Sequence, residues 1–172
     1  PAIRVLNTVH QGLFQVESGR KWKDRCMVAE AVAVCRFRFL GVTKEFTGGL
    51  GWHDTGLSQL WRYNLHYFHY TIDLMILGKC SSQERAYAVF RRLVQDWIRN
   101  NGSIQGDGWH PYTLSLRAVN WIEGIRFFQD KIDNDDEFRS HILRSLYRQA
   151  EILYRDREFD VRGNHLLENL RA

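Results

Sequence analysis

The chain has 172 residues, a length that fits one domain, and its 44% hydrophobic and 26% charged residues exclude a disordered polypeptide. The sequence holds no run of 18 apolar residues, which excludes a membrane span. Arginine supplies 19 of the 24 basic residues in a net charge of +4, and aromatic residues make up 13%. Because arginine suits carboxylates, sulfates and phosphates, this composition favours acidic sugars or nucleic acid as ligands.

The N-terminal third has a weak pattern. Residues 1–20 show little periodicity, and residues 21–39 predict a helix, or a helix followed by an extended piece. Residues 42–55 are rich in glycine and predict a loop. Residues 58–77 then form a strongly periodic segment that is aromatic on several faces, which predicts one helix ended by Gly78.

The rest of the chain alternates helices with short loops. Helices are expected over residues 82–100, 113–130 and 135–157, with a Gly-rich turn over 100–108 and a fifth helix near Asn164. No convincing strand is found. The helices at 58–77 and 113–130 are apolar nearly all round, whereas the other two are amphipathic. This alternation predicts an all-α fold with inner and outer layers, a helical solenoid or toroid.

Three cysteines, an odd number, exclude a complete set of disulfides, and no zinc-type spacing is present. The pair His66 and His69 has a spacing that could bind a metal, but no carboxylate or cysteine accompanies it. We therefore predict no metal and no cofactor.

The first polar cluster lies within residues 60–68, where Trp61, Asn64 and His66 share two helical turns with further aromatic residues. One interpretation is a sugar platform, on which rings stack on aromatic side chains while Asn and His address hydroxyl or carboxylate groups. The alternative is an aromatic inner helix whose polar atoms are satisfied locally.

The second cluster is Trp109 and His110, followed by Arg117 and Asn120 on one face of an otherwise apolar helix. A buried arginine is costly unless it is paired. Arg117 therefore either meets an acid such as Glu123 or Glu168, or faces a cleft that binds anions, and the sequence does not decide between them.

The third cluster is Asn164 and His165, directly after Gly163. Asn164 fits an ordinary helix N-cap. The alternative places amide and imidazole donors at a helix N-terminus, a position that favours anions.

The order and spacing of these clusters resemble the N-terminal helical part of the heparinase II/III-like and alginate-lyase-like polysaccharide lyases. The resemblance spans roughly residues 52–172. It is carried by three segments: Leu60-Trp61-Arg62-Tyr63-Asn64-Leu65-His66-Tyr67-Phe68; Trp109-His110-Pro111-Tyr112 with Leu114-Ser115-Leu116-Arg117 and Val119-Asn120-Trp121-Ile122; and Gly163-Asn164-His165-Leu166-Leu167-Glu168-Asn169.

The resemblance implies an incomplete (α/α) toroid, residues 1–172 as a single helical domain with 51–172 as toroid helices, and a β-sandwich domain later in the parent protein. It implies β-elimination of uronic-acid polysaccharides, with Asn164 and His165 as the catalytic pair that neutralises the substrate carboxylate. Groove residues implied are Trp61, Asn64, His66, Trp109, His110, Arg117 and Asn120. The family's catalytic tyrosine lies beyond Ala172, so the 172 residues alone are expected to be inactive.

The resemblance also implies a periplasmic or secreted protein. We expect the chain, which begins at Pro1, to be a piece of a longer protein.

Two other functions remain open: a non-catalytic toroid that binds acidic carbohydrate, and a module that binds nucleic acid. The basic residues do not form one long stripe, which argues against nucleic acid as the partner.

Overall fold

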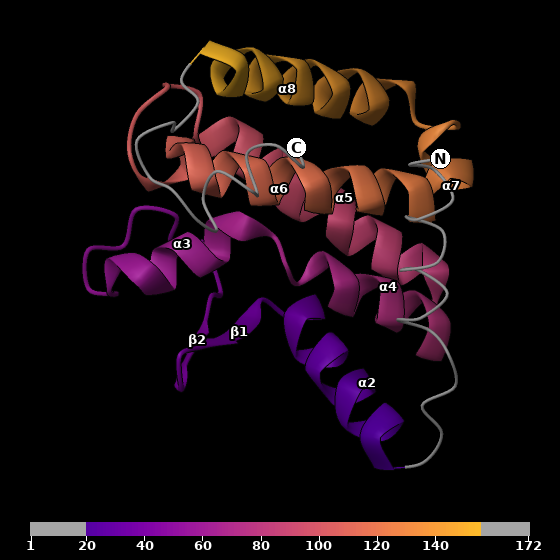
Figure 1. The fold of residues 1–172 in the computed structure, drawn as a ribbon. Coiled ribbons are helices and arrows are strands. Elements are labelled where there is room, and N and C mark those ends of the chain that lie inside the picture. The colour runs from indigo at the N-terminus through magenta and orange to yellow at the C-terminus, as the bar shows by residue number, and fades with distance from the viewer. Residues whose placement is uncertain (1–19, 156–172) are drawn as a thin grey trace, which may run out of the picture.

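The computed structural model describes residues 20–155. Its elements in chain order, shown in Figure 1, are α2 (Arg20–Ala33), β1 (Arg36–Phe39), β2 (Val42–Glu45), α3 (Gln59–Tyr67), α4 (Thr71–Cys80), α5 (Gln83–Asn100), the 3-10 turn η1 (Asp107–Trp109), α6 (Pro111–Phe127), α7 (Gln129–Ile132) and α8 (Asp136–Arg155). The predicted N-terminal helix with an extended piece after it is confirmed by α2 and β1. The helix expected near Asn164 lies outside the described residues.

The strands β1 and β2 form an antiparallel hairpin that the sequence did not predict. Arg36 pairs with Glu45 and Phe39 with Val42. The two turn residues, Leu40 and Gly41, both have positive φ angles (54° and 79°), as a tight hairpin turn requires. The expectation that 42–55 is all loop was therefore wrong at its start, because four-residue strands leave too short an alternating pattern to detect.

The predicted helix over 58–77 is divided in two at Phe68, which the sequence did not indicate. Phe68 has a left-handed backbone (φ 59°, ψ 25°) and ends α3, and α4 begins three residues later and continues past Gly78 to Cys80. A left-handed conformation is unfavourable for a bulky residue. Phe68 is nevertheless fully buried, stacked on Trp52 at 5.8 Å and edge-on to Trp121 at 5.3 Å. Tertiary packing thus holds the break in place.

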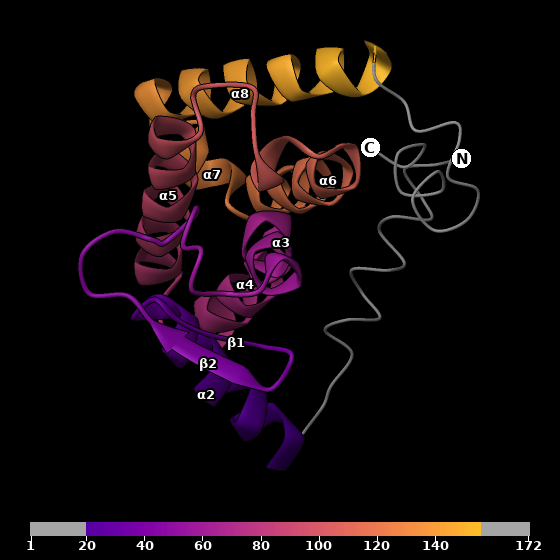
Figure 2. The same cartoon turned by 90° about the vertical axis from the view of Figure 1, so that its left-hand side faces the viewer.

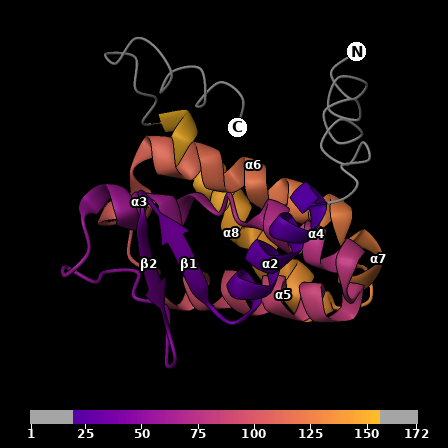
Figure 3. The same cartoon turned by 90° about the horizontal axis from the view of Figure 1, so that it is seen from below.

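The remaining helices follow the sequence closely. Ser82 caps α5 by accepting a hydrogen bond from the Arg85 amide, and Pro111 occupies the first turn of α6, where its missing N–H costs nothing. The inner and outer arrangement is also confirmed: α6 packs on α3, α4 and α8, while α5 packs on α4 and α8. In Figure 2, α8 lies across one end of α5 and α6, and α2 with the hairpin lies at the opposite end; Figure 3 looks onto α2 and the hairpin from below. The chain is therefore a mostly helical, incomplete (α/α) toroid with a small hairpin.

A close approach of the central helices depends on Gly124 in α6. A Cβ atom at this position would lie 2.5 Å from the Phe90 ring of α5 and 3.1 Å from Thr71 Cγ2 of α4. Phe90 is fully buried and has no room to move. We expect Gly124→Ala to lower the free energy of unfolding by about 1–3 kcal/mol, because overpacking exceeds the gain in helix propensity.

Denaturant unfolding of the purified protein measures this change. Gly102→Ala is the matched control, because its Cβ would meet no atom within 4 Å. A Gly124→Ala variant as stable as the Gly102→Ala control would contradict the tight packing of α6.

Candidate functional site

The break at Phe68 leaves backbone carbonyls at the end of α3 without helical partners, and side chains take their place. Tyr70 donates from its hydroxyl to the Leu65 carbonyl (3.1 Å). Arg117 Nη1 lies 3.5 Å from the His66 carbonyl, and Asn120 Nδ2 donates to the Tyr67 carbonyl (2.8 Å). Two residues predicted from the sequence as groove lining, Arg117 and Asn120, thus cap this helix end.

Arg117 is fully buried, and none of its partners within residues 20–155 is an acid. Its Nε donates to Gln149 Oε1 (2.9 Å) and its Nη1 to the Gly108 carbonyl (2.8 Å), and the guanidinium lies 3.8 Å above the Trp97 ring. Glu123 instead lies beside Arg126, and Glu168 is outside the described residues. Burial holds the pKa of Arg117 well below its usual range.

No carboxylate within residues 20–155 pairs with the Arg117 guanidinium, so other groups stabilise its charge. The C-terminus of α3 carries partial negative charge, and carbonyl oxygens and the π face of tryptophan attract a guanidinium. Arg117 Nη2 has no hydrogen-bond partner among residues 20–155. Arg117 therefore joins α3, η1, α6 and α8 around one buried charge.

His66 is buried beside Arg117 and has a fixed tautomer. Trp97 Nε1 donates to His66 Nδ1 (2.9 Å), so the ring proton lies on Nε2, which donates to the Trp52 carbonyl (3.1 Å). Burial, with a further contribution from the Arg117 cation, lowers the pKa of His66 to about 3. His66 is thus a neutral structural histidine with both ring nitrogens engaged.

The lowered pKa of His66 predicts a loss of stability in acid. The unfolded chain takes up a proton near the ordinary pKa of 6.5, whereas folded His66 stays neutral down to about 3. The contribution of His66 to the free energy of unfolding is complete above pH 6.5. Between pH 6.5 and about 3 it falls by roughly 1.4 kcal/mol for each pH unit of acidification. Denaturant unfolding at a series of pH values should show this slope.

The matched control is His141→Gln, which removes an exposed histidine. We expect His66→Gln to be less stable at neutral pH and to have a flatter pH profile below 6.5, while His141→Gln keeps the parent slope. An unchanged slope in His66→Gln would show that other groups cause the acid sensitivity.

Tyrosine and histidine side chains gather where α3 faces the start of α6, and we call this surface the α3–α6 face. Tyr67 lies at its centre, edge-on to Tyr112 at 5.6 Å, and Tyr63 lies 5.5 Å from His110. His69 is exposed at its edge, where its Nδ1 lies 3.1 Å from Asn120 Nδ2. Burial, together with Tyr112 and Tyr63, raises the pKa of Tyr67 to about 12, so its hydroxyl is protonated at neutral pH.

The other predicted groove residues fall into two groups. Asn64 is half-buried on α3 and donates to the Leu60 carbonyl (2.8 Å), and His110 is half-buried on the α3–α6 face. Trp61 and Trp109 are buried, and each donates its ring N–H to a backbone carbonyl, that of Val42 (3.1 Å) and that of Asn101 (3.0 Å).

Asn164 and His165, the predicted catalytic pair, lie outside the described residues. The structure places His110 beside Tyr63 and Asn120 beside His69 on the α3–α6 face, and it buries His66 and Arg117 in the interior. Trp109 packs against Trp97, with their ring centres 5.5 Å apart.

Two residues of the candidate site and of its buried support, Gln149 and Tyr67, were not predicted from the sequence. Gln149 is the partner of Arg117, and its signal was present: it lies in the buried stripe of α8 with Ile142 and Leu153, where a polar residue is unusual. Tyr67 is, in the sequence, only one of several aromatic residues in the 58–77 segment. Its central place depends on α6 packing across α3, which local spacing does not reveal.

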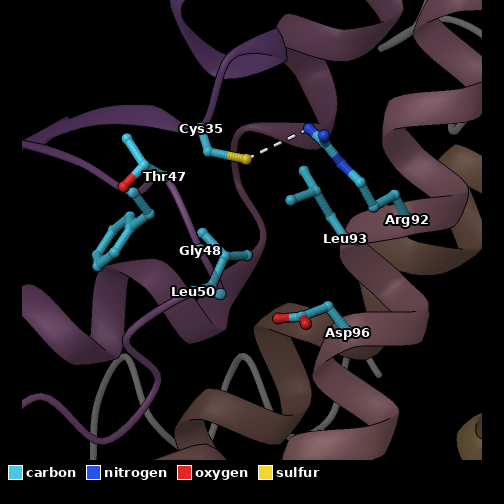
Figure 4. Close-up of a pocket in the computed structure, with 9 residues that line it drawn as sticks. Cys35, Thr47, Gly48, Leu50, Arg92, Leu93 and Asp96 are labelled. Carbon is cyan, nitrogen blue, oxygen red and sulfur yellow. Dashed lines mark hydrogen bonds between the residues drawn. The ribbon is translucent and has the colours of Figure 1, made fainter.

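A separate pocket lies behind the hairpin, lined among others by Cys35, Gly48, Leu50, Arg92 and Asp96 (Figure 4). Arg92 Nη2 lies 3.3 Å from the Cys35 sulfur, and Asp96 accepts from the ring N–H of Trp52, a tryptophan of the core (2.7 Å). Burial raises the pKa of the Cys35 thiol, against the smaller opposite effect of Arg92. A protonated thiol is a poor nucleophile, so this pocket offers no obvious chemistry.

The described part of the chain contains no cluster of three or more His, Cys, Asp or Glu side chains able to hold a metal ion. None of the helices between residues 20 and 155 is long and apolar enough to cross a membrane.

Comparison with solved structures places the fold beside two lyases. The chain superposes on a heparan sulfate lyase HepC mutant from Pedobacter heparinus with a TM-score of 0.75 and 18% identity, over 90% of this chain and 25% of that one. It superposes on a heparinase III gene product with methylated lysines with a TM-score of 0.77 and 16% identity, over 91% of this chain and 27% of that one. No family model and no curated protein sequence matches. The chain thus has the fold of about a quarter of each lyase.

Proposed function

We propose that this chain is the N-terminal helical domain of a polysaccharide lyase that cleaves uronic-acid-containing polysaccharide by β-elimination. The observation that carries the proposal is the superposition of nine-tenths of the chain on two heparan sulfate lyases. The ordered residue motifs support it independently, because they are a property of the sequence and not of the fold.

In this proposal the α3–α6 face carries the substrate groove. Its aromatic rings and imidazoles suit a sugar chain, because rings pack on the apolar faces of sugars while ring nitrogens reach hydroxyl and carboxylate groups. His110 and Asn120 act from this face, and Asn64 contributes from elsewhere on α3. The buried Trp61, His66 and Arg117 support it from behind, since their polar atoms are bound within the fold.

The chemical step removes the C5 proton of a uronate, which is only weakly acidic while the neighbouring carboxylate is ionised. Hydrogen bonds from Asn164 and His165 to that carboxylate stabilise the enolate-like charge as it forms. The C5 proton passes to a base, the C4–O bond breaks, and the leaving oxygen takes a proton from an acid. A tyrosine beyond Ala172 supplies the acid, and a β-sandwich domain completes the parent enzyme. We propose no cofactor for this step.

The test follows the product directly. The intact protein is incubated separately with heparan sulfate, hyaluronan, alginate and polygalacturonate, and the ultraviolet absorbance of the unsaturated uronate is recorded. A rise with one polymer identifies the substrate class. Saturable glycan binding by the intact protein, with no unsaturated product from any of the four, would contradict the proposal.

A further inference from the structure

A second, cationic pocket lies on the far side of η1 from the α3–α6 face. It is enclosed by α8, the end of α5 and the loop that follows α5, and we call it the α5–α8 pocket. Trp97 and Trp109 line it together with His141, Arg144 and Arg148 of α8. Because the last three are spaced by three and four residues along a helix, their side chains lie on the same face.

The polar groups of the α5–α8 pocket are mainly cations and hydrogen-bond donors. None of the lining residues in the described structure is acidic. Arg148 is held in place, because its Nη1 donates to the Gly102 carbonyl (3.0 Å) and its guanidinium lies 5.2 Å from the Trp109 ring centre. Arg144 is exposed and forms no ion pair within residues 20–155.

The arginines near the two ends of α8 differ from Arg144. Arg139 pairs with Asp136 (2.6 Å) and Arg155 lies beside Glu151 (4.0 Å). The helix thus pairs these two arginines with acids, whereas Arg144 and Arg148, which line the pocket, form no ion pair within residues 20–155. A fixed arginine beside an uncommitted one is an arrangement suited to an oxyanion.

The size of the pocket limits what it takes. Its volume is about 180 Å³, below the roughly 300–1,000 Å³ of sites that enclose whole small molecules. It therefore fits one substituent of a larger ligand. A tetrahedral sulfo group with part of its sugar ring matches the combination of arginines above an indole.

We propose that the α5–α8 pocket is an accessory subsite that binds a sulfo group of an acidic glycan, apart from the site of elimination. The preference for an oxyanion depends on the pocket's own side chains, whereas the choice of a glycan as its source rests on the proposed function. Such a subsite would hold a polymer on the outer surface of the toroid while another part of the same chain occupies the groove.

The experiment measures binding by calorimetry with the intact protein. The ligands are a short heparin-derived oligosaccharide, the same oligosaccharide after desulfation, and inorganic sulfate. We expect Arg144→Gln to raise the dissociation constant of the sulfated oligosaccharide about tenfold, because one charge-assisted contact is lost. Arg139→Gln is the matched control, because it removes the same charge from the same helix outside the pocket, and it should change the dissociation constant less than twofold.

Equal weakening by Arg144→Gln and Arg139→Gln would overturn the subsite, since only net charge would then matter. Equal affinity for the sulfated and the desulfated oligosaccharide would rule out the sulfo group as the ligand. If inorganic sulfate binds and the sulfated oligosaccharide does not, a glycan would be ruled out as the source of the sulfo group. Turnover is recorded in parallel with a short substrate. If binding depends on Arg144 but no elimination occurs, the lyase proposal is refuted and the subsite stands. If elimination occurs but binding does not depend on Arg144, the subsite is refuted and the lyase proposal stands.

Discussion

Replacing Arg117 with methionine is expected to lower the free energy of unfolding by about 3–5 kcal/mol. The substitution keeps much of the apolar contact with Trp97 but removes every donor of the guanidinium. The Gly108 carbonyl and Gln149 Oε1 then lose their bonds from Arg117 in the interior, and the longer contact to the His66 carbonyl is lost as well. Each buried acceptor left without a partner costs about 1–3 kcal/mol, and removal of the costly buried cation offsets part of the sum.

Denaturant unfolding measures the effect of this substitution. Arg85→Met is the matched control, because Arg85 pairs with Glu30 at the surface, where both side chains are 44% exposed. Ion pairs of that kind contribute little, so the control should change the free energy of unfolding by less than about 1 kcal/mol. An Arg117→Met variant as stable as this control would show that the buried network does not support the fold.

Arg117→Lys separates charge from geometry. Lysine keeps the positive charge, but a single ammonium group cannot reproduce the planar fork that reaches Gln149 and Gly108. We expect it to recover only a small part of the lost stability. Full recovery would mean that the charge at the end of α3 matters more than the directed hydrogen bonds.

The largest expected effect on activity is that of Asn164→Ala in the intact enzyme. The proposed mechanism assigns Asn164 a hydrogen bond to the substrate carboxylate that strengthens as charge develops. Removing one such donor lowers kcat by about 100- to 1,000-fold in comparable sites. His165→Ala should cause a loss at least as large, because imidazole and amide act on the same carboxylate. The rate of unsaturated uronate formation measures both.

Two controls make this result specific to the catalytic pair. Asn134→Ala and His53→Ala remove the same residue types from exposed positions outside the α3–α6 face and the α5–α8 pocket, and should keep turnover within twofold. Thermal unfolding of each variant shows whether lost activity reflects lost structure. Normal turnover by a correctly folded Asn164→Ala variant would refute the assignment of this residue.

The amphipathic helices were the most predictable part of the fold. The sequence placed α5 and α8 within about two residues, because their pattern of apolar and polar positions and the Ser82 cap are local properties of the chain. The distinction between inner and outer helices followed from the same pattern. The positions of His110, Arg117 and Asn120 on helix α6 or at its start were also correctly expected.

Other features depended on contacts between residues distant in sequence. The left-handed Phe68 exists because the rings of Trp52 and Trp121 enclose it, and propensity alone favours one continuous helix there. That break creates the free carbonyls to which Arg117 and Asn120 bind. The sequence could therefore identify a costly buried arginine but not its partners.

Periodicity within single segments was enough to predict the amphipathic helices, the two helical layers and the polar residues that interrupt the apolar faces. Only the tertiary structure decided which of those residues face outward and which stabilise the interior. His66 is a structural neutral histidine because Trp52 and Trp97, from two other segments, take both of its ring nitrogens. The direction of a side chain is set by the elements packed against it, and that information is not local.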